Sequence, residues 1–393
     1  MNKSIYICAA AAMMLASCSN DEVVEQAQEN AISFRSMMGA NTRGVVADVS
    51  NLNTLCVTAY QGTSLLFDNV IFQKDGTGFF NSAKPYYWPE TGELTFTVLS
   101  GNWSGTRDFT SSTEQWMKNV TIDDDISKQE DMTYVSNVTG TKAANGKVGV
   151  PLEMKHALAQ IQISAKNENS NYVYKVKGIR IYSVQNGGIF DFKNEKWSEN
   201  GGLACYETTY DTPIGLTETV QSIMGESGNA MVLPFRTTAW DGTATSGSFD
   251  VPLSLNPGQQ GSVTGSYISV LVNIQMKLGA TVYPDKVGGY AWAAIPVSFE
   301  WEKGKKYVYT LDFTNGAGKV DPMDPGTDWD ASKDPAKAAP ILGGLIRFGV
   351  TVSEWGTDDK NVDLKDSEKF DVTVDGWTDE TKDAPLQLSL IHI

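Results

Sequence analysis

The sequence predicts an all-β protein built from β-sandwiches, and three observations lead to that prediction. Short segments alternate apolar and polar residues, most clearly Leu94 to Leu99 and Tyr307 to Phe313. Turn signals such as Lys74-Asp75-Gly76-Thr77 separate these segments. Helical periodicity is weak and appears only around Ser111 to Met117 and Thr217 to Met224. Many short strands divided by turns are typical of sandwiches, and 393 residues are enough for about two domains.

The first residues have the pattern of a bacterial lipoprotein signal. Lys3 gives a positive start, an apolar run extends from Ile5 to Leu15, and small residues precede Cys18. Removal of a signal peptide over residues 1–17 would leave the thiol and amine of Cys18 free for acylation. Several acyl chains on one residue anchor a protein stably, so we expect Cys18 to carry a membrane anchor.

The strand candidates follow a polar, acidic tether that extends from Asp21 to Asn30. In chain order they lie at 32–38, 54–60, 67–73, 78–81, 94–99, 132–138, 148–152, 156–165, 172–184, 189–192, 230–234, 248–255, 267–277, 291–300, 307–313 and 345–352. A linker at 316–340, rich in Pro, Asp and Gly, precedes the last of them. Compact domains rarely contain such long loops without a reason. The last strand can fold back onto its own sheet or leave it to pair elsewhere, and the sequence leaves both alternatives open.

Charge and cysteine content exclude several classes of partner. A net charge of −16 repels nucleic acid and anionic lipid. Cys8 lies in the signal and Cys18 at the lipid site, which leaves Cys56 and Cys205 as small buried thiols, with a disulfide between them as the alternative. Residues 388–393 (Leu-Ser-Leu-Ile-His-Ile) resemble a sequencing adapter, so the fold prediction omits them.

Catalytic and metal-binding motifs are missing from the sequence. His156 is the only histidine outside the adapter-like end, and no Cys-x-x-Cys, His-Glu-x-x-His or phosphate-binding glycine loop occurs. We therefore predict no enzyme activity, no cofactor and no metal. Carboxylates cluster at Asp123 to Asp125 and through Asp321, Asp324, Asp328 and Asp330, where a solvated segment is expected and calcium is the alternative for the second cluster.

Aromatic residues allow a second interpretation, which is a platform that stacks against sugars. The candidates are Tyr86, Tyr87, Trp88, Trp103, Trp116 and Trp197. Aromatic residues at strand spacing more often fill a sandwich core, which is the structural alternative.

An ordered set of motifs resembles the fimbrillin family, the subunits of type V pili in anaerobic gut and oral bacteria. The set consists of the lipoprotein signal, Thr42-Arg43-Gly44, Tyr86-Tyr87-Trp88-Pro89, Lys155 to Ile161, Val176 to Ile181, Trp301 to Leu311 and Ile346 to Trp355. The resemblance extends roughly from Cys18 to Trp355.

The resemblance implies two tandem transthyretin-like, immunoglobulin-like β-sandwich domains. Their expected bounds are 44–153 and 154–355, after a lipidated tether and removable first strand at 18–43 and before a tail at 356–393. It also implies that an arginine-specific protease cuts between Arg43 and Gly44 and so opens a groove that a strand from a neighbouring subunit fills. Donor-strand pairing of this kind is a known mode of recognition. The matching donor residues are Leu345, Ile346, Phe348, Val350 and Val352.

The function expected from this resemblance is a structural and adhesive pilus subunit. Its partners would be other pilus subunits, the protease, the outer membrane through the lipid, and host or bacterial surface ligands. Its location would be the outer-membrane surface and, after processing, the fimbrium. The alternative function is a permanently anchored outer-membrane lipoprotein that binds glycans through exposed tryptophans.

Overall fold

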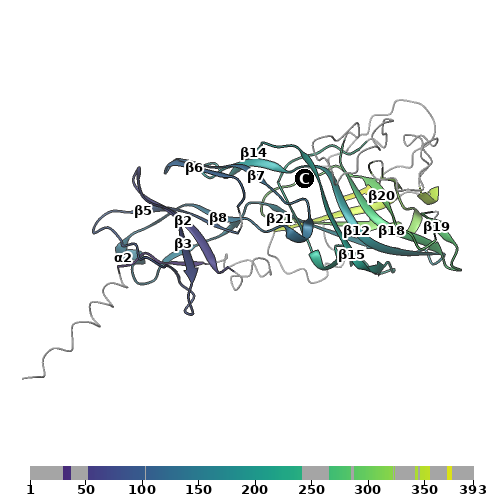
Figure 1. Cartoon of the computed structure of the whole chain (residues 1–393), viewed down its shortest axis with the longest axis horizontal. Helices are drawn as coiled ribbons and strands as arrows, with labels where there is room; N and C mark the ends of the chain where they lie inside the picture. Colours follow the sequence, from purple (N-terminus) through teal and green to yellow (C-terminus); the bar gives the residue numbers. More distant parts are fainter. Residues whose placement is uncertain are drawn as a thin grey trace, which may run out of the picture.

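The computed structural model describes residues 30–36, 52–101, 103–240, 265–284, 287–321, 323, 341–343, 346–354 and 370–373. Cys18, Arg43, Gly44 and Leu345 therefore lie outside the described residues. The described strands form an elongated arrangement, with β2, β3 and β5 toward one end and β18 and β19 toward the other (Figure 1).

The all-β prediction is confirmed. The described helices are α2 (Lys142–Asn145) and short 3₁₀ turns, and none of them is long and apolar enough to cross a membrane. The weak helical signals were wrong. Ser111 ends strand β6 (Thr106–Ser111), and a tight turn leads from it into β7 (Glu114–Thr121). Residues 221–222 form another strand, because pairing with neighbouring strands overrides a weak local periodicity.

An eight-stranded sheet occupies the end of the molecule that holds β2, β3 and β5. Its order is β10-β8-β5-β2-β3-β4-β1-β9. The strands are β1 (Phe34–Ser36), β2 (Thr54–Gln61), β3 (Ser64–Lys74), β4 (Phe80–Ser82), β5 (Leu94–Ser100), β8 (Thr133–Gly140), β9 (Val150–Leu152) and β10 (Lys155–His156). The sheet curls so that Phe34 of β1 packs against Phe96 of β5, which encloses a first hydrophobic core.

Two further sheets form the other end of the molecule. The β11 sheet has the order β16-β11-β21-β23-β24, with β17 also paired to β11. The β12 sheet has the order β15-β12-β18-β20-β22, with β19 also paired to β18. Their strands are β11 (Ala159–Lys166), β12 (Tyr172–Gln185), β15 (Leu203–Gly215), β16 (Gln221–Ser222), β17 (Ala230–Val232), β18 (Tyr267–Met276), β19 (Thr281–Tyr283), β20 (Ala291–Pro296), β21 (Lys305–Asp312), β22 (Lys319–Val320), β23 (Arg347–Glu354) and β24 (Phe370–Thr373).

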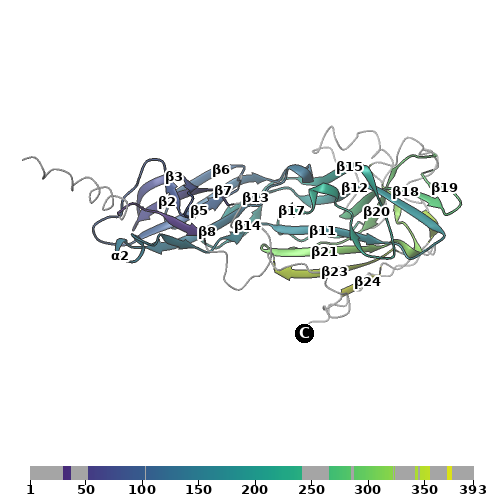
Figure 2. The same ribbon diagram turned by 90° about the horizontal axis from the view of Figure 1, so that it is seen from below.

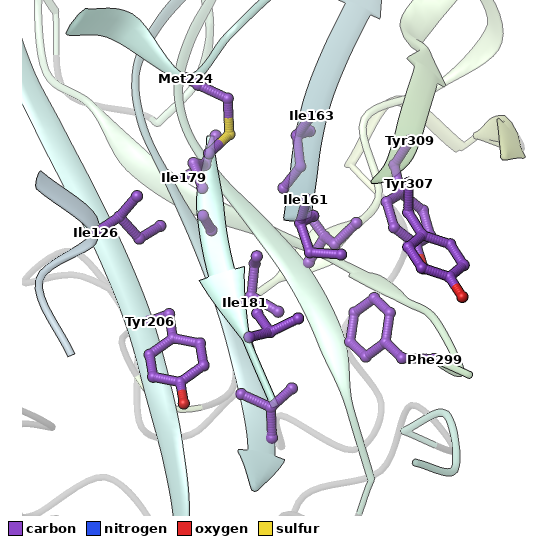
Figure 3. Packing of buried hydrophobic residues seen from close by; sticks show 14 of the residues in the cluster. Ile126, Ile161, Ile163, Ile179, Ile181, Tyr206, Met224, Phe299, Tyr307 and Tyr309 are labelled. Atoms are coloured by element: carbon purple, nitrogen blue, oxygen red, sulfur yellow. The ribbon is translucent and has the colours of Figure 1, made fainter. Parts of the chain in front are cut away.

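The second core lies between the β11 and β12 sheets. Ile161 and Ile163 of β11 point toward Ile179 and Ile181 of β12, and Tyr309 of β21 lies beside them (Figure 3). The inward residues alternate along each strand, as expected for facing sheets.

A four-stranded sheet connects the two ends. Its order is β14-β13-β7-β6, where β13 is Gly187–Asp191 and β14 is Lys196–Glu199. β7 precedes residue 153 in the sequence, whereas β13 follows it, and the two pair from Thr121↔Gly187 to Trp116↔Asp191. Figure 2 shows these strands between the two ends. The division of the chain at 153 and 154 stays a prediction.

Candidate functional site

Strand β1 lies in the sheet between two strands that are distant in sequence. It pairs antiparallel with β4 through Phe34 and Phe80, and parallel with β9 from Phe34↔Val150 to Ser36↔Leu152. The residues before it are also paired, because the Ile32 N–H donates to Tyr86 O at 2.7 Å. An inserted strand therefore begins at the predicted place, and the structure describes it as far as Ser36.

Two side chains hold this segment in the first core. Ile32 is 2% exposed and Phe34 is fully buried. The Phe34 ring meets Phe72 and Phe96 edge-on, with centroid distances of 5.0 and 5.1 Å. Each of these apolar side chains contributes about 1.5 to 3 kcal/mol by burial. The burial of these two side chains therefore contributes to holding the segment in the sheet.

Gly149 allows β1 to lie close to the loop before β9. Its φ is +69°, and a Cβ at this position would lie 3.2 Å from the Phe79 ring and 3.3 Å from Ser33 Oγ. The Val150 N–H then donates to Ser33 O at 2.9 Å. Gly149 lies within the strand expected at 148–152, and a glycine inside a strand is the sequence signal for such a close approach.

The backbone of Arg35 is paired in the ladder, and its side chain is exposed. It pairs with Pro151 of β9, and its guanidinium lies 5.7 Å from the centre of the Phe79 ring. In the sequence the next lysine or arginine is Arg43, and the one after that is Lys74 in β3.

The predicted donor segment folds back onto its own sheet. β23 pairs antiparallel with β21 from Lys305↔Glu354 to Asp312↔Arg347, and β24 pairs with its other edge. Ile346 and Phe348 are buried in the second core, Val350 is partly buried, and Val352 is 48% exposed. The structure thus realises the first of the two alternatives that the sequence left open.

A buried carboxylate fixes the chain before this segment. Asp321 is fully buried, and its Oδ1 accepts hydrogen bonds from Tyr267 Oη at 2.8 Å and from the Met323 N–H at 2.9 Å. Its Oδ2 lies 3.8 Å from Arg180 Nη1. Arg180 also donates to Glu207 at 2.6 Å. Asp321 is therefore an anchor and not part of a solvated cluster, which corrects that expectation; Asp324, Asp328 and Asp330 lie outside the described residues.

A second polar cluster joins the first sheet to the turn before β21. Glu195 accepts hydrogen bonds from Lys155 Nζ at 2.9 Å and from Tyr134 Oη at 3.1 Å, while Lys303 Nζ lies 3.7 Å from it. Burial alone would raise the pKa of Glu195, but the bond from Lys155 and the charges of Lys155 and Lys303 outweigh burial and lower it. No local sequence pattern indicates this cluster, because its members are far apart along the chain.

The histidine, aspartate and cysteine side chains that could have carried chemistry make structural contacts instead. His156 Nδ1 lies 2.8 Å from Asp131 Oδ2, where the pair is mostly buried. Asp125 caps a 3₁₀ turn by accepting from the Ser127 N–H. Cys56 and Cys205 are free and partly buried, and burial raises the pKa of both thiols. Among the described residues no three metal-binding side chains come together.

The proposed sugar platform is divided between different parts of the molecule. Trp88 is buried in the first core, whereas Trp103 and Trp197 stack on each other at 6.1 Å against the second core. Their indole N–H groups donate to backbone carbonyls, Trp103 to Ser100 and Trp197 to Ala157. Tyr87 is half exposed. These aromatic side chains therefore act mainly in packing and do not form one open face.

Comparison with known proteins identifies the family. The model of the fimbrillin-like family matches residues 42–327, which is most of the chain. The chain belongs to the fimbrillin-like family. It is therefore a structural protein of the pilus or adhesin type rather than an enzyme, it associates with other pilus subunits, and it is located at the cell surface.

Solved structures of candidate cell adhesion proteins resemble the fimbrillin-like chain. One from Bacteroides uniformis is 12% identical, with a TM-score of 0.42 over 83% of this chain and 99% of the other. One from Parabacteroides distasonis is also 12% identical, with a TM-score of 0.44 over 83% and 97%. No curated protein sequence matches the chain. The identification depends on the family match.

Proposed function

We propose that this chain is the precursor of a pilus subunit that polymerises by strand exchange. In this proposal Cys18 carries the lipid that anchors the precursor in the outer membrane. A protease then cuts between Arg43 and Gly44, which detaches β1 with the anchor. A strand of the next subunit, from Leu345 to Val352, fills the vacated position.

The insertion of β1 between β4 and β9 is the observation that carries the proposal. Without β1, backbone groups of both neighbours lose their partners, and the positions of Ile32 and Phe34 open into the first core. Unpaired strand edges and an open core are unfavourable in water. An incoming extended strand would satisfy both at once.

The position of the basic residues supports cleavage at Arg43. Arg35 is paired within β1, and proteases need the local backbone to open before they can bind it. A cut after Arg43 would leave all of β1 on the removed side. Because the donor of one subunit enters the acceptor of the next, the contact is head-to-tail, and such contacts give filaments.

Mild trypsin treatment of the purified chain tests the proposal. We expect a product that starts at Gly44 and then forms polymers that resist SDS without heating. Arg43→Ala should prevent both events, whereas the matched variant Arg35→Ala should leave both unchanged. Pili extracted from cells that retain residues 31–43 would contradict the proteolytic step.

A further inference from the structure

We propose that the exchange has one defined register, in which Ile346 and Phe348 of one subunit replace Ile32 and Phe34 of the next. This inference depends on the proposed function and specifies which side chains select the incoming strand. Phe348 would be the main specificity-determining residue.

The two segments share a sequence pattern. Ile32-Ser33-Phe34-Arg35 and Ile346-Arg347-Phe348-Gly349 both place a phenylalanine two residues after an isoleucine, and Ile-x-Phe occurs nowhere else in the sequence. Residues two apart in a strand lie on the same face. Each segment therefore presents the same two apolar side chains, at the same spacing, to a core.

The acceptor position is shaped by these two side chains. Phe34 is fully buried between Phe72 and Phe96, whose rings it meets edge-on, and Ile32 is almost fully buried beside the same core. Cores are packed closely, so a smaller residue leaves a cavity and a larger one causes strain. An incoming Ile-x-Phe segment would fill both positions with side chains of identical shape.

The rest of β23 also suits the vacated position. In its own sheet β23 leaves Val352 48% exposed and Val350 only partly buried. In the proposed register Val350 takes the position of Ser36, opposite Leu152 of β9, and Gly349 takes that of Arg35, opposite Pro151. The eight residues of β23 are more than enough to span the described part of β1, from Phe34 to Ser36.

Cysteine cross-linking of the full chain tests the register. The variant Gly349→Cys with Pro151→Cys places a thiol at two positions that the proposed register puts opposite each other. The matched variant Thr351→Cys with Pro151→Cys requires a strand shifted by two residues, which keeps the same face. Both are cleaved with trypsin, oxidised mildly and separated without reductant. Cysteines bridge only when their Cα atoms are within about 7 Å, so the first variant should give a covalent ladder at least about ten-fold stronger than the second.

The outcomes separate the register from the proposed function. Covalent polymers from the Gly349→Cys, Pro151→Cys variant support the register. Covalent polymers from the Thr351→Cys, Pro151→Cys variant alone would overturn the register, but they would still support strand exchange. If the unmodified chain forms no polymers after cleavage at Arg43, the proposed function fails and the register fails with it.

Polymerisation rates give a second measurement. Phe348→Ala should slow polymerisation of the cleaved chain at least as much as Val350→Ala does. Equal rates for Phe348→Ala and the unmodified chain would also overturn the inference. Circular dichroism before cleavage confirms that each variant is folded.

Discussion

Strands β1 and β23 both bury an isoleucine and a phenylalanine two residues apart, but the molecule holds them by different means. β1 lies between β4 and β9 and buries Ile32 and Phe34 in the first core. β23 has eight register pairs with β21, and the anchored Asp321 precedes it. Both strands thus bury the same two residue types, but β1 does so in the first core between two neighbours, and β23 does so in the second core beside one long antiparallel partner.

Phe34→Ala should give the largest effect on the intact chain. It removes a fully buried ring from the first core, and such changes lower the free energy of unfolding by about 3 to 5 kcal/mol. Guanidinium unfolding followed by tryptophan fluorescence measures the loss. Hydrogen exchange should show the amides of β4 and β9 opening first.

Phe348→Ala is the matched change in β23. We expect a smaller loss of stability, with faster exchange along β21 and little change at β9, because eight backbone pairs remain. Equal losses at Phe34 and Phe348, with the same exchange pattern, would contradict the distinction between the two strands.

Asp321→Ala tests the anchor before β23. The change removes the carboxylate that partly neutralises the buried Arg180 guanidinium, and it removes the hydrogen-bond acceptor of Tyr267. Breaking a buried ion pair lowers the free energy of unfolding by about 3 kcal/mol or more. Exchange should increase at β22 and around residue 323, while β1 stays protected. Loss of protection at β1 instead would show that the two regions are not independent.

Gly149→Ala tests the close approach of β1. A side chain at φ +69° costs about 1 to 2 kcal/mol, and here the Cβ would also press on Phe79 and Ser33. The matched variant Gly62→Ala has φ +60° with open space around it, so it has the conformational cost alone. We expect Gly149→Ala to be the less stable of the two and to speed tryptic release of β1. Identical behaviour would mean that β1 does not depend on this contact.

Glu195→Gln should have the smallest effect, and it depends on pH. Because the pKa of Glu195 is lowered below 4.5 in the folded chain, its stabilisation is present above pH 4.5 and is lost as pH falls through the folded pKa. At pH 7 the variant should lose about 1 kcal/mol or less, since Lys155 is half exposed. Thermal melts at pH 7 and pH 3 should show the difference shrinking. A difference that stays constant would assign the effect to packing.

Sequence patterns predicted the positions of individual strands better than they predicted which strands pair with each other. Leu94 to Leu99 appears as Leu94–Ser100, and the segment expected at 345–352 appears as Arg347–Glu354. Alternation of apolar residues reports burial on one face, and it locates these two strands within about two residues. It does not find β6, β7, β14 or β15, and the strand expected at 291–300 ends at Pro296. The parallel pairing of β1 with β9 has no such local signal, because it joins residues more than a hundred positions apart.

The candidate site was predicted only in part. The place of the inserted strand followed from the family resemblance and the parity of Ile32 and Phe34. The roles of Gly149 and Asp321 did not, since both depend on which distant groups pack against them. Asp321 lies in a segment whose composition is typical of a solvated linker, and only the fold shows that Arg180 and Tyr267 enclose it.

The pairing of β7 with β13 has a mechanical consequence. β7 belongs to the part of the chain before residue 153 and β13 to the part after it, so their pairing ties these two parts together by backbone hydrogen bonds as well as by the covalent chain. Its strands extend roughly along the long axis (Figure 2). A pull on the two ends would load the hydrogen bonds between β7 and β13 in shear, where several must break together. The molecule would thus resist a pulling force as one rigid unit rather than as two domains joined by a flexible linker.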